Sequence, residues 1–549
     1  MFLWENLELF KFLPAIRYMF FLFPLIVLQS QVRIDFMRKY QHFIFIFFVF
    51  ISRAQTLSLD NVFDFSKQNI GTLMGDNGSL SHYILYEKYE AGQQKVKKQV
   101  ISFFDESLTV NHNEENIYST ENNLFAVYNN QSHLIAAFHD KKAELVRFKV
   151  YNSKGSVSNT VEFHFDKRLF YPYLNYYYKL VFPVNNKGFL VNQIIKKKRL
   201  GYNVTFVNNL GESSWVYESP ADHDNRKEVT PFFANDQVVI LCEKEWGSNY
   251  DHKPTFNIIV LNSQTGKVIF TKSKDYEVNP DYYTNAFVTN QGEVLLFGEL
   301  FEQNNSITKN DYNVGYFFEK FDLTGTQTKS NVLSLMDERF KSFIGFDKVS
   351  NKDDFGTVYF SSIKQYKGDY YFVGQIVRRT KQGNTFGNQI LSATIGGAIG
   401  GAISNNWQSA YELKDMVVMK VDSNLNLIDC TLLSKTVTQT GLNTLVSRPQ
   451  YNLMEMEYNG RLDFVNYQVY NDEQVVIYKT LERSGDLDKL LLKRTVLKEG
   501  RLVYLDDYEI SFDKDDSYYS LLPYNQNSLL VFKYNYELKR LKIVKNAVD

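Results

Sequence analysis

The chain has 549 residues, of which 44% are hydrophobic, 22% charged and 16% aromatic, and its formal net charge is −1. This composition is sufficient for a globular core, and the low numbers of Pro (10) and Gly (28) exclude a collagen-like or proline-rich low-complexity chain. The balanced charge, without a concentrated basic stripe, argues against nucleic acid as a partner.

The N-terminal region contains the pattern of a secretory signal peptide at residues 37–54. Arg38 and Lys39 form a short basic segment, nine apolar residues follow at 43–51, and a small-residue cleavage site precedes Gln55. Nine residues are too few to cross a bilayer as a helix. We therefore expect an exported protein, located in the periplasm, on the cell surface or outside the cell.

The residues on either side of this signal have their own interpretations. Residues 1–36 contain a second apolar run and are either a spurious extension before a true start at Met37 or a membrane segment. Residues 55–79 are expected to form an N-terminal linker. The folded domain is expected to occupy residues 80–549.

From residue 80 onward, short strand-like segments alternate with polar turns, and the turns repeat. An inner hairpin turn rich in Asn, Asp and Gly occurs seven times, beginning near Tyr128, Val184, Ala234, Thr289, Tyr366, Tyr458 and Tyr524. An outer turn places glycines at 155, 211, 266 and 325, which are 56, 55 and 59 residues apart. Four strands repeated at such a period predict a β-propeller.

The two ends of the repeat region predict how the propeller closes. An outer-type hairpin at residues 101–112 has no recognised inner turn before it, and the last inner turn has little chain after it. If N-terminal strands complete the blade that the C-terminal strands begin, no sheet edge is left open along the ring. Six complete blades and one composite blade give seven. The alternative is a pair of β-sandwich domains, but no linker separates two such domains.

A glycine-rich insertion at residues 381–410 interrupts one blade. Gly396, Gly397, Gly400 and Gly401 lack the Lys and Ser/Thr of a phosphate-binding loop, so that function is excluded. Their spacing of four instead allows close backbone approach on one helical face. The insertion, with Trp407 at its exit, either packs on a neighbouring blade or is an interaction element for an envelope or membrane-associated partner.

The sequence offers little support for catalysis or for a bound metal. Cys242 and Cys430 lie in apolar strand-like contexts and are expected to be buried free thiols. The eight His show no metal-binding spacing, and no Gly-x-Ser-x-Gly nucleophile motif is present. We therefore predict no catalytic residue, no metal ligand and no cofactor.

The best binding candidates are aromatic. The segment 168–180 contains Tyr171, Tyr173, Tyr176 and Tyr178, which either contact sugars or peptides or serve as ordinary core and edge residues. Trp215 belongs to the turn sequence NNLGESSWVY, which resembles the Asp-box of sialidase-like propellers. Because Asn209 stands where that motif has Asp, and the likeness covers one hairpin, it transfers no catalytic residue.

Over residues 80–549, the repeats and polar turns resemble uncharacterised exported β-propeller-like proteins of bacteria. The resemblance concerns architecture and implies no active site. The function expected from the sequence is that of an exported, non-catalytic binding or scaffolding protein with an unknown protein or glycan ligand. The alternative is an exported glycan- or peptide-acting enzyme whose site lies in the propeller channel.

Overall fold

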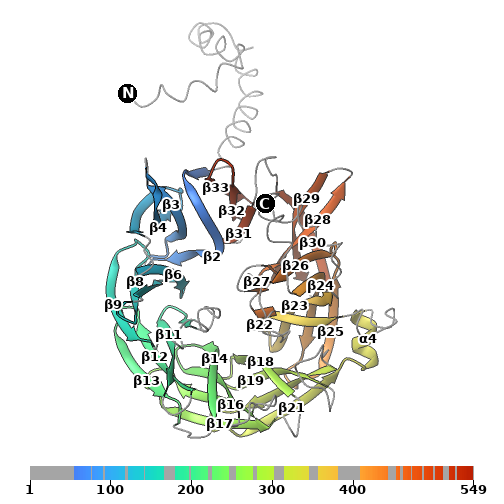
Figure 1. Ribbon diagram of the computed structural model, residues 1–549. Helices are drawn as coiled ribbons and strands as arrows, with labels where there is room; N and C mark the ends of the chain where they lie inside the picture. The colour runs from blue at the N-terminus through green and yellow to red at the C-terminus, as the bar shows by residue number, and fades with distance from the viewer. Residues whose placement is uncertain are drawn as a thin grey trace, which may run out of the picture.

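The computed structural model is an all-β ring. It describes residues 55–547 except residues 76, 91–92, 118–121, 141, 166–179, 197–199, 221–224, 247–254, 276–280, 302–313, 345–355, 381–408, 443–452, 455, 458–460, 471–472, 485–486, 499–500, 511–517 and 526–527. The described strands form eight antiparallel sheets, arranged radially in chain order around a central axis (Figure 1). The predicted β-propeller of four-stranded blades is confirmed.

We number the sheets as blades I to VIII, with the innermost strand of each blade first. Blade I contains β2 (Val62–Met74), β3 (Leu80–Glu90), β4 (Gln93–Asp105) and β5 (Val110–Ile117). Blade II contains β6 (Asn122–Asn129), β7 (Leu134–Asp140), β8 (Leu145–Tyr151) and β9 (Val157–His164). Blade III contains β10 (Val181–Val184), β11 (Gly188–Lys196), β12 (Leu200–Asn208) and β13 (Ser213–Glu218). Blade IV contains β14 (Arg226–Ala234), β15 (Val238–Trp246), β16 (Thr255–Asn262) and β17 (Val268–Asp275).

The second half of the ring follows the same plan. Blade V contains β18 (Asp281–Val288), β19 (Val294–Leu300), β20 (Gly315–Phe321) and β21 (Gln327–Ser334). Blade VI contains β22 (Thr357–Tyr366), β23 (Asp369–Thr380), β24 (Ser409–Val421) and β25 (Leu427–Leu433). Blade VII contains β27 (Phe464–Tyr470), β28 (Glu473–Ser484), β29 (Leu487–Lys498) and β30 (Arg501–Ile510). Blade VIII contains β31 (Tyr518–Asn525), β32 (Ser528–Asn535), β33 (Arg540–Ala547) and, from the other end of the chain, β1 (Gln55–Leu59).

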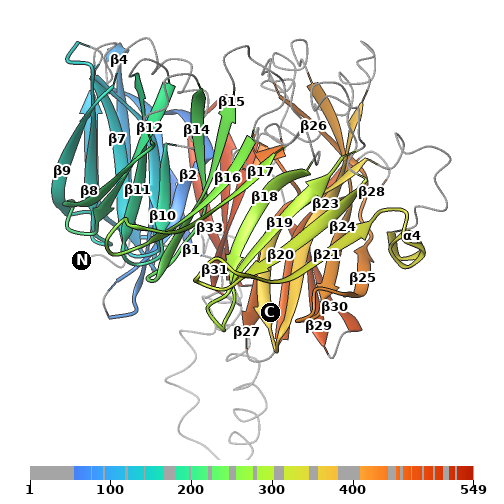
Figure 2. The same cartoon turned by 90° about the horizontal axis from the view of Figure 1, so that it is seen from below.

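Two further elements stand outside the four-strand plan. Strand β26 (Thr438–Leu442) pairs with the first half of β24 and extends blade VI, and the short helix α4 (Glu338–Ile344) follows β21. Seen from the side, β26 lies at one end of the ring and α4 on its outside (Figure 2). The glycine-rich insertion connects β23 to β24, and its residues 381–408 lie outside the described part of the chain.

The core of the protein lies between neighbouring blades. Each pair of adjacent sheets encloses its own cluster of buried apolar side chains, and the eight clusters run around the whole ring. In blade V, for example, Phe297 and Phe318 pack on Phe360 and Phe372 of blade VI, with ring centroids 5.0–5.5 Å apart. Short alternating strands thus bury both faces, because each sheet uses its neighbours as cover.

The ring closes by pairing the two ends of the chain, as predicted, but through different strands. Residues 55–59 pair antiparallel with β33, from Gln55 opposite Lys545 to Leu59 opposite Leu541. Blades VIII and I then share a core in which Ile84 packs with Phe532. The expected partner, the hairpin at residues 101–112, instead belongs to blade I, and residues 55–59 and 62–74 form strands where a linker was expected.

The predicted number of seven blades is wrong, because the described strands form eight. The inner turn of blade I, with Gly78 at φ +77°, lies inside the segment that was interpreted as a linker and was therefore not counted. One other turn was misplaced. The inner hairpin of blade VII begins after Tyr470 rather than near Tyr458.

The outer hairpins of blades I to VI share one turn. It starts with Asp or Asn, whose side-chain oxygen accepts hydrogen bonds from backbone N–H groups two to four residues later; in blade V, Asp322 accepts them from Thr324 and Thr326 at 2.9 Å. Three or four residues after the Asp or Asn, a residue adopts a positive φ, as Gly155, Gly211, Gly266 and Gly325 do. The predicted outer-turn glycines therefore have the left-handed conformation that favours glycine.

Candidate functional site

Most of the innermost strands of the ring are irregular in their pairing with the next strand. In the described pairing, seven of the eight innermost strands shift register: β2 does so twice, and each of the other six skips a single residue, which is a β-bulge. The skipped residues are Phe125, Phe232, Thr284, Ser361, Val465 and Tyr524. A bulge redirects a side chain that regular alternation would place elsewhere, and bulges are frequent beside functional sites. The channel side of the ring is therefore the first place to look for a site.

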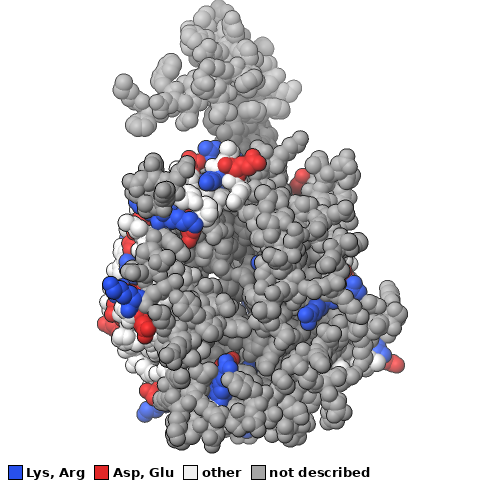
Figure 3. Space-filling view, viewed as in Figure 1, with Lys and Arg blue, Asp and Glu red and all other residues white. Residues whose placement is uncertain are grey.

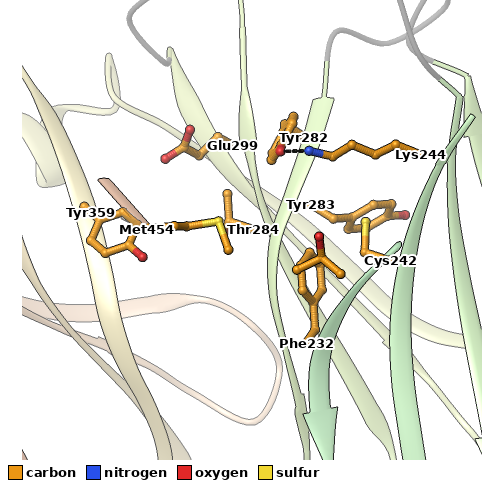
Figure 4. A pocket seen from close by; sticks show the side chains of 10 residues that line it. Phe232, Cys242, Lys244, Tyr282, Tyr283, Thr284, Glu299, Tyr359 and Met454 are labelled. Atoms are coloured by element: carbon orange, nitrogen blue, oxygen red, sulfur yellow. Dashed lines mark hydrogen bonds between the residues drawn. The ribbon is translucent and has the colours of Figure 1, made fainter. Parts of the chain in front are cut away.

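Two of these bulge residues line a cavity of about 200 Å³, which we call the channel pocket. Phe232 comes from blade IV and Thr284 from blade V, while Phe182 of blade III and Tyr359 of blade VI complete the walls around them. Met454, from the connection between β26 and β27, lies between Tyr359 and Thr284 (Figure 4). A cavity of about 150 Å³ already accepts a benzene-sized molecule, so this pocket has room for one small ring or one extended side chain.

The polar side chains of the channel pocket include two carboxylates. The hydroxyl group of Tyr359 donates to Glu457 Oε2 at 2.6 Å, and this bond holds the carboxylate at the wall. Glu299, on β19, is a second lining carboxylate and is only 4% exposed. The rest of the lining is mainly aromatic or apolar, with Thr284 and Asn285 as further polar side chains. Such a pocket combines flat apolar faces with a few fixed polar groups, which is the usual construction of a small-ligand site.

A much smaller cavity of about 20 Å³ adjoins the channel pocket and shares Phe232, Thr284 and Glu299 with it. Its far wall is formed by Lys244, which donates a hydrogen bond to the Tyr282 hydroxyl group and lies over the Tyr282 ring at 4.3 Å from the centroid (Figure 4). The free thiol of Cys242 also lines it. Lys244 therefore belongs to a wall between blades IV and V.

The wall that carries Met454 and Glu457 is anchored by a buried polar network. Asp463 accepts hydrogen bonds from Thr438 Oγ1 at 2.6 Å and from Gln375 Nε2 at 3.0 Å, and it pairs with Lys435 Nζ at 3.0 Å. Burial opposes ionisation of Asp463, but Lys435 and Lys479 outweigh it, so the pKa of Asp463 lies below its usual value. The network ties the connection between β26 and β27 to blade VI.

The described residues give no support for a metal site, for a surface patch of one charge sign or for a membrane-spanning helix. In the described part of the chain, no group of three or more His, Cys, Asp or Glu side chains is placed to hold a metal ion. The coloured acidic and basic side chains on the face seen in Figure 3 are mixed along the rim rather than gathered by sign. No helix within the described ranges is both long and apolar enough to cross a membrane.

The structure places one of the predicted binding residues, and its position is structural. Trp215 is 8% exposed, stacks on Phe206, and donates a hydrogen bond from Nε1 to the Ser263 carbonyl at 2.7 Å. It fixes the outer strand of blade III to the outer turn of blade IV, away from the channel pocket. The remaining candidates lie outside the described residues: Tyr171, Tyr173, Tyr176, Tyr178, Gly396, Gly397, Gly400, Gly401 and Trp407.

The expectation of buried free thiols at Cys242 and Cys430 is confirmed. Sequence reasoning missed the channel pocket, because its residues come from four blades and the connection between β26 and β27. The sequence signal that could have indicated the pocket was the position of its residues within the repeat. Phe232 and Thr284 precede an inner turn by a few residues in their repeats, which places both on an innermost strand.

A family model matches residues 37–545 of the chain. The chain belongs to DUF6770, a family of unknown function. No curated protein matches the sequence. Similar solved structures include the β-propeller domain of the Trilobed protease from Pyrococcus furiosus, with 9% identity, a TM-score of 0.33, and coverage of 83% of this chain and 97% of that chain.

Two further solved structures are similar at the same low level. The polysaccharide lyase Uly1 has 10% identity and a TM-score of 0.37, with 77% of this chain and 90% of that chain covered. A prolyl endopeptidase has 7% identity and a TM-score of 0.37, with 86% of this chain and 55% of that chain covered. Similarity at this level carries no argument about the activity of the DUF6770 chain.

Proposed function

We propose that the protein is an exported, non-catalytic binding protein that takes its ligand in the channel pocket. The observation that supports this most directly is the pocket's construction. Aromatic side chains from four blades and the carboxylates of Glu299 and Glu457 surround one cavity of about 200 Å³. The ring supplies a rigid frame, and bulges at Phe232 and Thr284 direct side chains into the cavity.

The export part of the proposal draws on the signal-peptide pattern and on where the fold begins. The expected cleavage site precedes Gln55, and Gln55 is the first residue of β1. Removal of residues 1–54 would therefore leave all eight described sheets complete. Sequencing of the mature N-terminus tests this: a start at Gln55 supports export with cleavage, and a retained N-terminus contradicts it.

Binding in the channel pocket is testable with one pair of variants. After a screen of soluble glycans and peptides has identified a ligand, Phe232→Ala is expected to weaken its binding at least about tenfold, because one aromatic face is lost. Phe125→Ala is the matched control, since Phe125 occupies the corresponding bulge in blade II outside the pocket. Equal affinities of the two variants would contradict the proposed site.

An enzymatic function of the same pocket is the second candidate, because Glu299 and Glu457 both line it. Glycoside hydrolysis uses two carboxyl groups about 5–10 Å apart on either side of the scissile bond. Turnover of a polysaccharide or peptide by the purified protein, abolished by Glu457→Gln, would establish this function and overturn the non-catalytic one.

A further inference from the structure

The turn between β2 and β3 carries an Asn-Gly pair at the surface of blade I. Asn77 and Gly78 are both exposed, and a Cβ atom added at Gly78 would have nothing within 4 Å. Among the described asparagines, Asn77 is the one that a glycine follows. Because residue 78 has no side chain, its backbone nitrogen is open to approach by the side-chain amide of Asn77. A nucleophile and an electrophile thus lie side by side in one exposed turn.

The amide carbonyl of this asparagine is bound by two donors from one residue. The backbone N–H of Ser79 donates to Asn77 Oδ1 at 3.1 Å, and the Ser79 hydroxyl group donates to the same oxygen at 2.6 Å. Both bonds make Cγ of Asn77 more electrophilic, and both stabilise the negative charge that develops on Oδ1 when a nucleophile adds to Cγ. They also restrict rotation of the amide group relative to the backbone that follows it.

One hydrogen bond of the turn opposes such an attack. The N–H of Gly78 donates to the Gly75 carbonyl at 2.9 Å, and this nitrogen must lose its proton before it can act as a nucleophile. The turn is exposed, so water can replace the carbonyl as the acceptor, and hydrogen bonds of this kind open at a small cost in free energy. The bond therefore slows the attack without preventing it.

The outer turn of blade IV has a similar activated carbonyl without the glycine. Asn262 Oδ1 accepts hydrogen bonds from the Gln264 N–H at 3.1 Å and from the Thr265 hydroxyl group at 3.0 Å. The next residue, Ser263, is only 7% exposed. Its side chain restricts the backbone and hinders the approach of its nitrogen to the amide. Asn262 is therefore a natural comparison for Asn77, with the electrophile but without the accessible nucleophile.

We infer that Asn77 is a site of spontaneous covalent modification, at which the asparagine is converted to aspartate and isoaspartate. The Gly78 nitrogen loses its proton and forms a bond to Cγ of Asn77, the bond from Cγ to the amide nitrogen breaks, and ammonia leaves with that proton. The product is a succinimide ring. Water then breaks one of the two carbonyl–nitrogen bonds of the ring: cleavage at Cγ gives aspartate, and cleavage at the main-chain carbonyl carbon gives isoaspartate. Nothing is oxidised or reduced.

Both products change a turn that lies against blade II. The Met74 N–H donates to the Gln131 carbonyl at 2.6 Å, and the Ser81 hydroxyl group donates to the Ser153 carbonyl at 2.7 Å. Aspartate adds a negative charge beside these contacts. Isoaspartate adds the same charge and also lengthens the backbone between Met74 and Leu80, which pair across the hairpin. The modified chain therefore holds the inner hairpin of blade I less tightly.

The test follows the modification in the whole protein. The protein is incubated at pH 8 and digested, and mass spectrometry of the peptides measures asparagine, aspartate and isoaspartate at each position. We expect conversion at Asn77 to be at least about tenfold faster than at Asn262, and Gly78→Ala to slow it at least about tenfold. Gly78→Ala places its new atom in open space, and circular dichroism checks that the fold is retained. Conversion no faster than at Asn262, or a rate unchanged by Gly78→Ala, would overturn the inference.

A second pair of variants tests the activation of the carbonyl. Ser79→Ala removes the hydroxyl donor and is expected to slow the conversion of Asn77 at least about threefold, whereas Ser79→Thr keeps a hydroxyl group and should restore the rate. Both variants leave Gly78 in place, and a turn that is merely loosened would react faster rather than more slowly. A rate in Ser79→Ala equal to or above that of the natural protein would overturn the activated site. None of these results depends on the channel pocket, so the inference and the proposed function fail separately.

Discussion

Single residues at the outer turns decide how closely the blades approach one another. A Cβ atom added at Gly266 would lie 2.6 Å from Trp215 Cε3, and one added at Gly325 would lie 2.8 Å from Phe270 Cβ. Each glycine therefore serves two purposes: it adopts a positive φ, and it lets the turn contact the outer strand of the preceding blade. The sequence revealed the first purpose through spacing, but the second depends on contacts between blades that spacing does not show.

Replacement of Gly266 separates these two effects. Gly266→Ala is expected to lower the free energy of unfolding by about 2–5 kcal/mol, because it adds contact with Trp215 to the cost of a positive φ. Gly292→Ala is the control, since Gly292 has φ +80° with nothing within 4 Å of the added Cβ, and it should cost only about 1–2 kcal/mol. Urea unfolding measures both values. Equal losses would show that contact with Trp215 is unimportant.

The residue with positive φ in the outer turn also explains why a search of the sequence did not find every repeat. In blades I and VI, the residue with positive φ is Leu108 (φ 58°) or Leu425 (φ 69°) rather than glycine, and both leucines are buried. Burial of an apolar side chain offsets the cost of the conformation at these sites. A search for glycine alone therefore finds four of the six turns.

At the scale of strands and connections, turn chemistry predicted hairpins well but not their order. Asn459-Gly460 looks like a hairpin turn in sequence, whereas the inner hairpin of blade VII is made by β27 and β28 after Tyr470. Local residues permit a turn at both places, so turn chemistry alone does not show which of them joins β27 to β28. The channel pocket was even less predictable, because bulges follow from the pairing of strands rather than from the composition of either strand.

The connection between β26 and β27 offers a pH-dependent test. Because the pKa of Asp463 is lower in the folded state, its contribution to stability is complete above the pKa of the unfolded chain, about 3.9, and is lost as the pH falls through the folded value. Asp463→Asn leaves Lys435 buried without its carboxylate and is expected to cost about 3–5 kcal/mol at pH 7. The difference from the natural protein should shrink below about pH 4.

Urea unfolding between pH 3 and pH 7 measures this dependence, and the methyl NMR signal of Met454 reports the pocket wall. Asp422→Asn is the matched control, because Asp422 begins an exposed outer turn in which Asn152 and Asn208 do the same task in other blades. We expect this control to be close to neutral. A similar loss in both variants, or a loss in Asp463→Asn that does not depend on pH, would contradict the assignment.

For the whole molecule, the sequence predicted the architecture and the principle of closure, but not the number of blades. The periodic turns give the four-stranded unit, and the need to avoid an open edge gives the pairing of the two chain ends. The count of blades was wrong at the N-terminus. No repeat unit precedes β1 and β2, so nothing in the sequence shows which positions of a blade these strands occupy. A ring of seven and a ring of eight differ only slightly in the angle between blades, so local sequence does not separate them.

Removal of β1 tests the closure directly. A chain that starts at Gln55 should be as stable as one that starts at Met37, whereas a chain that starts at Asn61 loses the pairing with β33 and the contacts of Leu57 and Leu59. We expect a loss of about 2–4 kcal/mol in the free energy of unfolding and self-association through the exposed β33 edge. Thermal unfolding and sedimentation measure these, and a peptide of residues 55–60 should restore the stability. Undiminished stability of the chain that starts at Asn61 would contradict this role of β1.

The position of β1 also has a consequence for the order in which the protein is completed. Asp60 and Arg540, which form an ion pair beside the closing strands, are 480 positions apart. Asp60 is synthesised first, and it stays without this partner until Arg540 has been synthesised. Blades I to VII can assemble in the meantime, and the curvature of the ring then brings β33 next to β1. A nascent chain interrupted before residue 540 therefore lacks β33, the strand that pairs with β1, so its ring stays open.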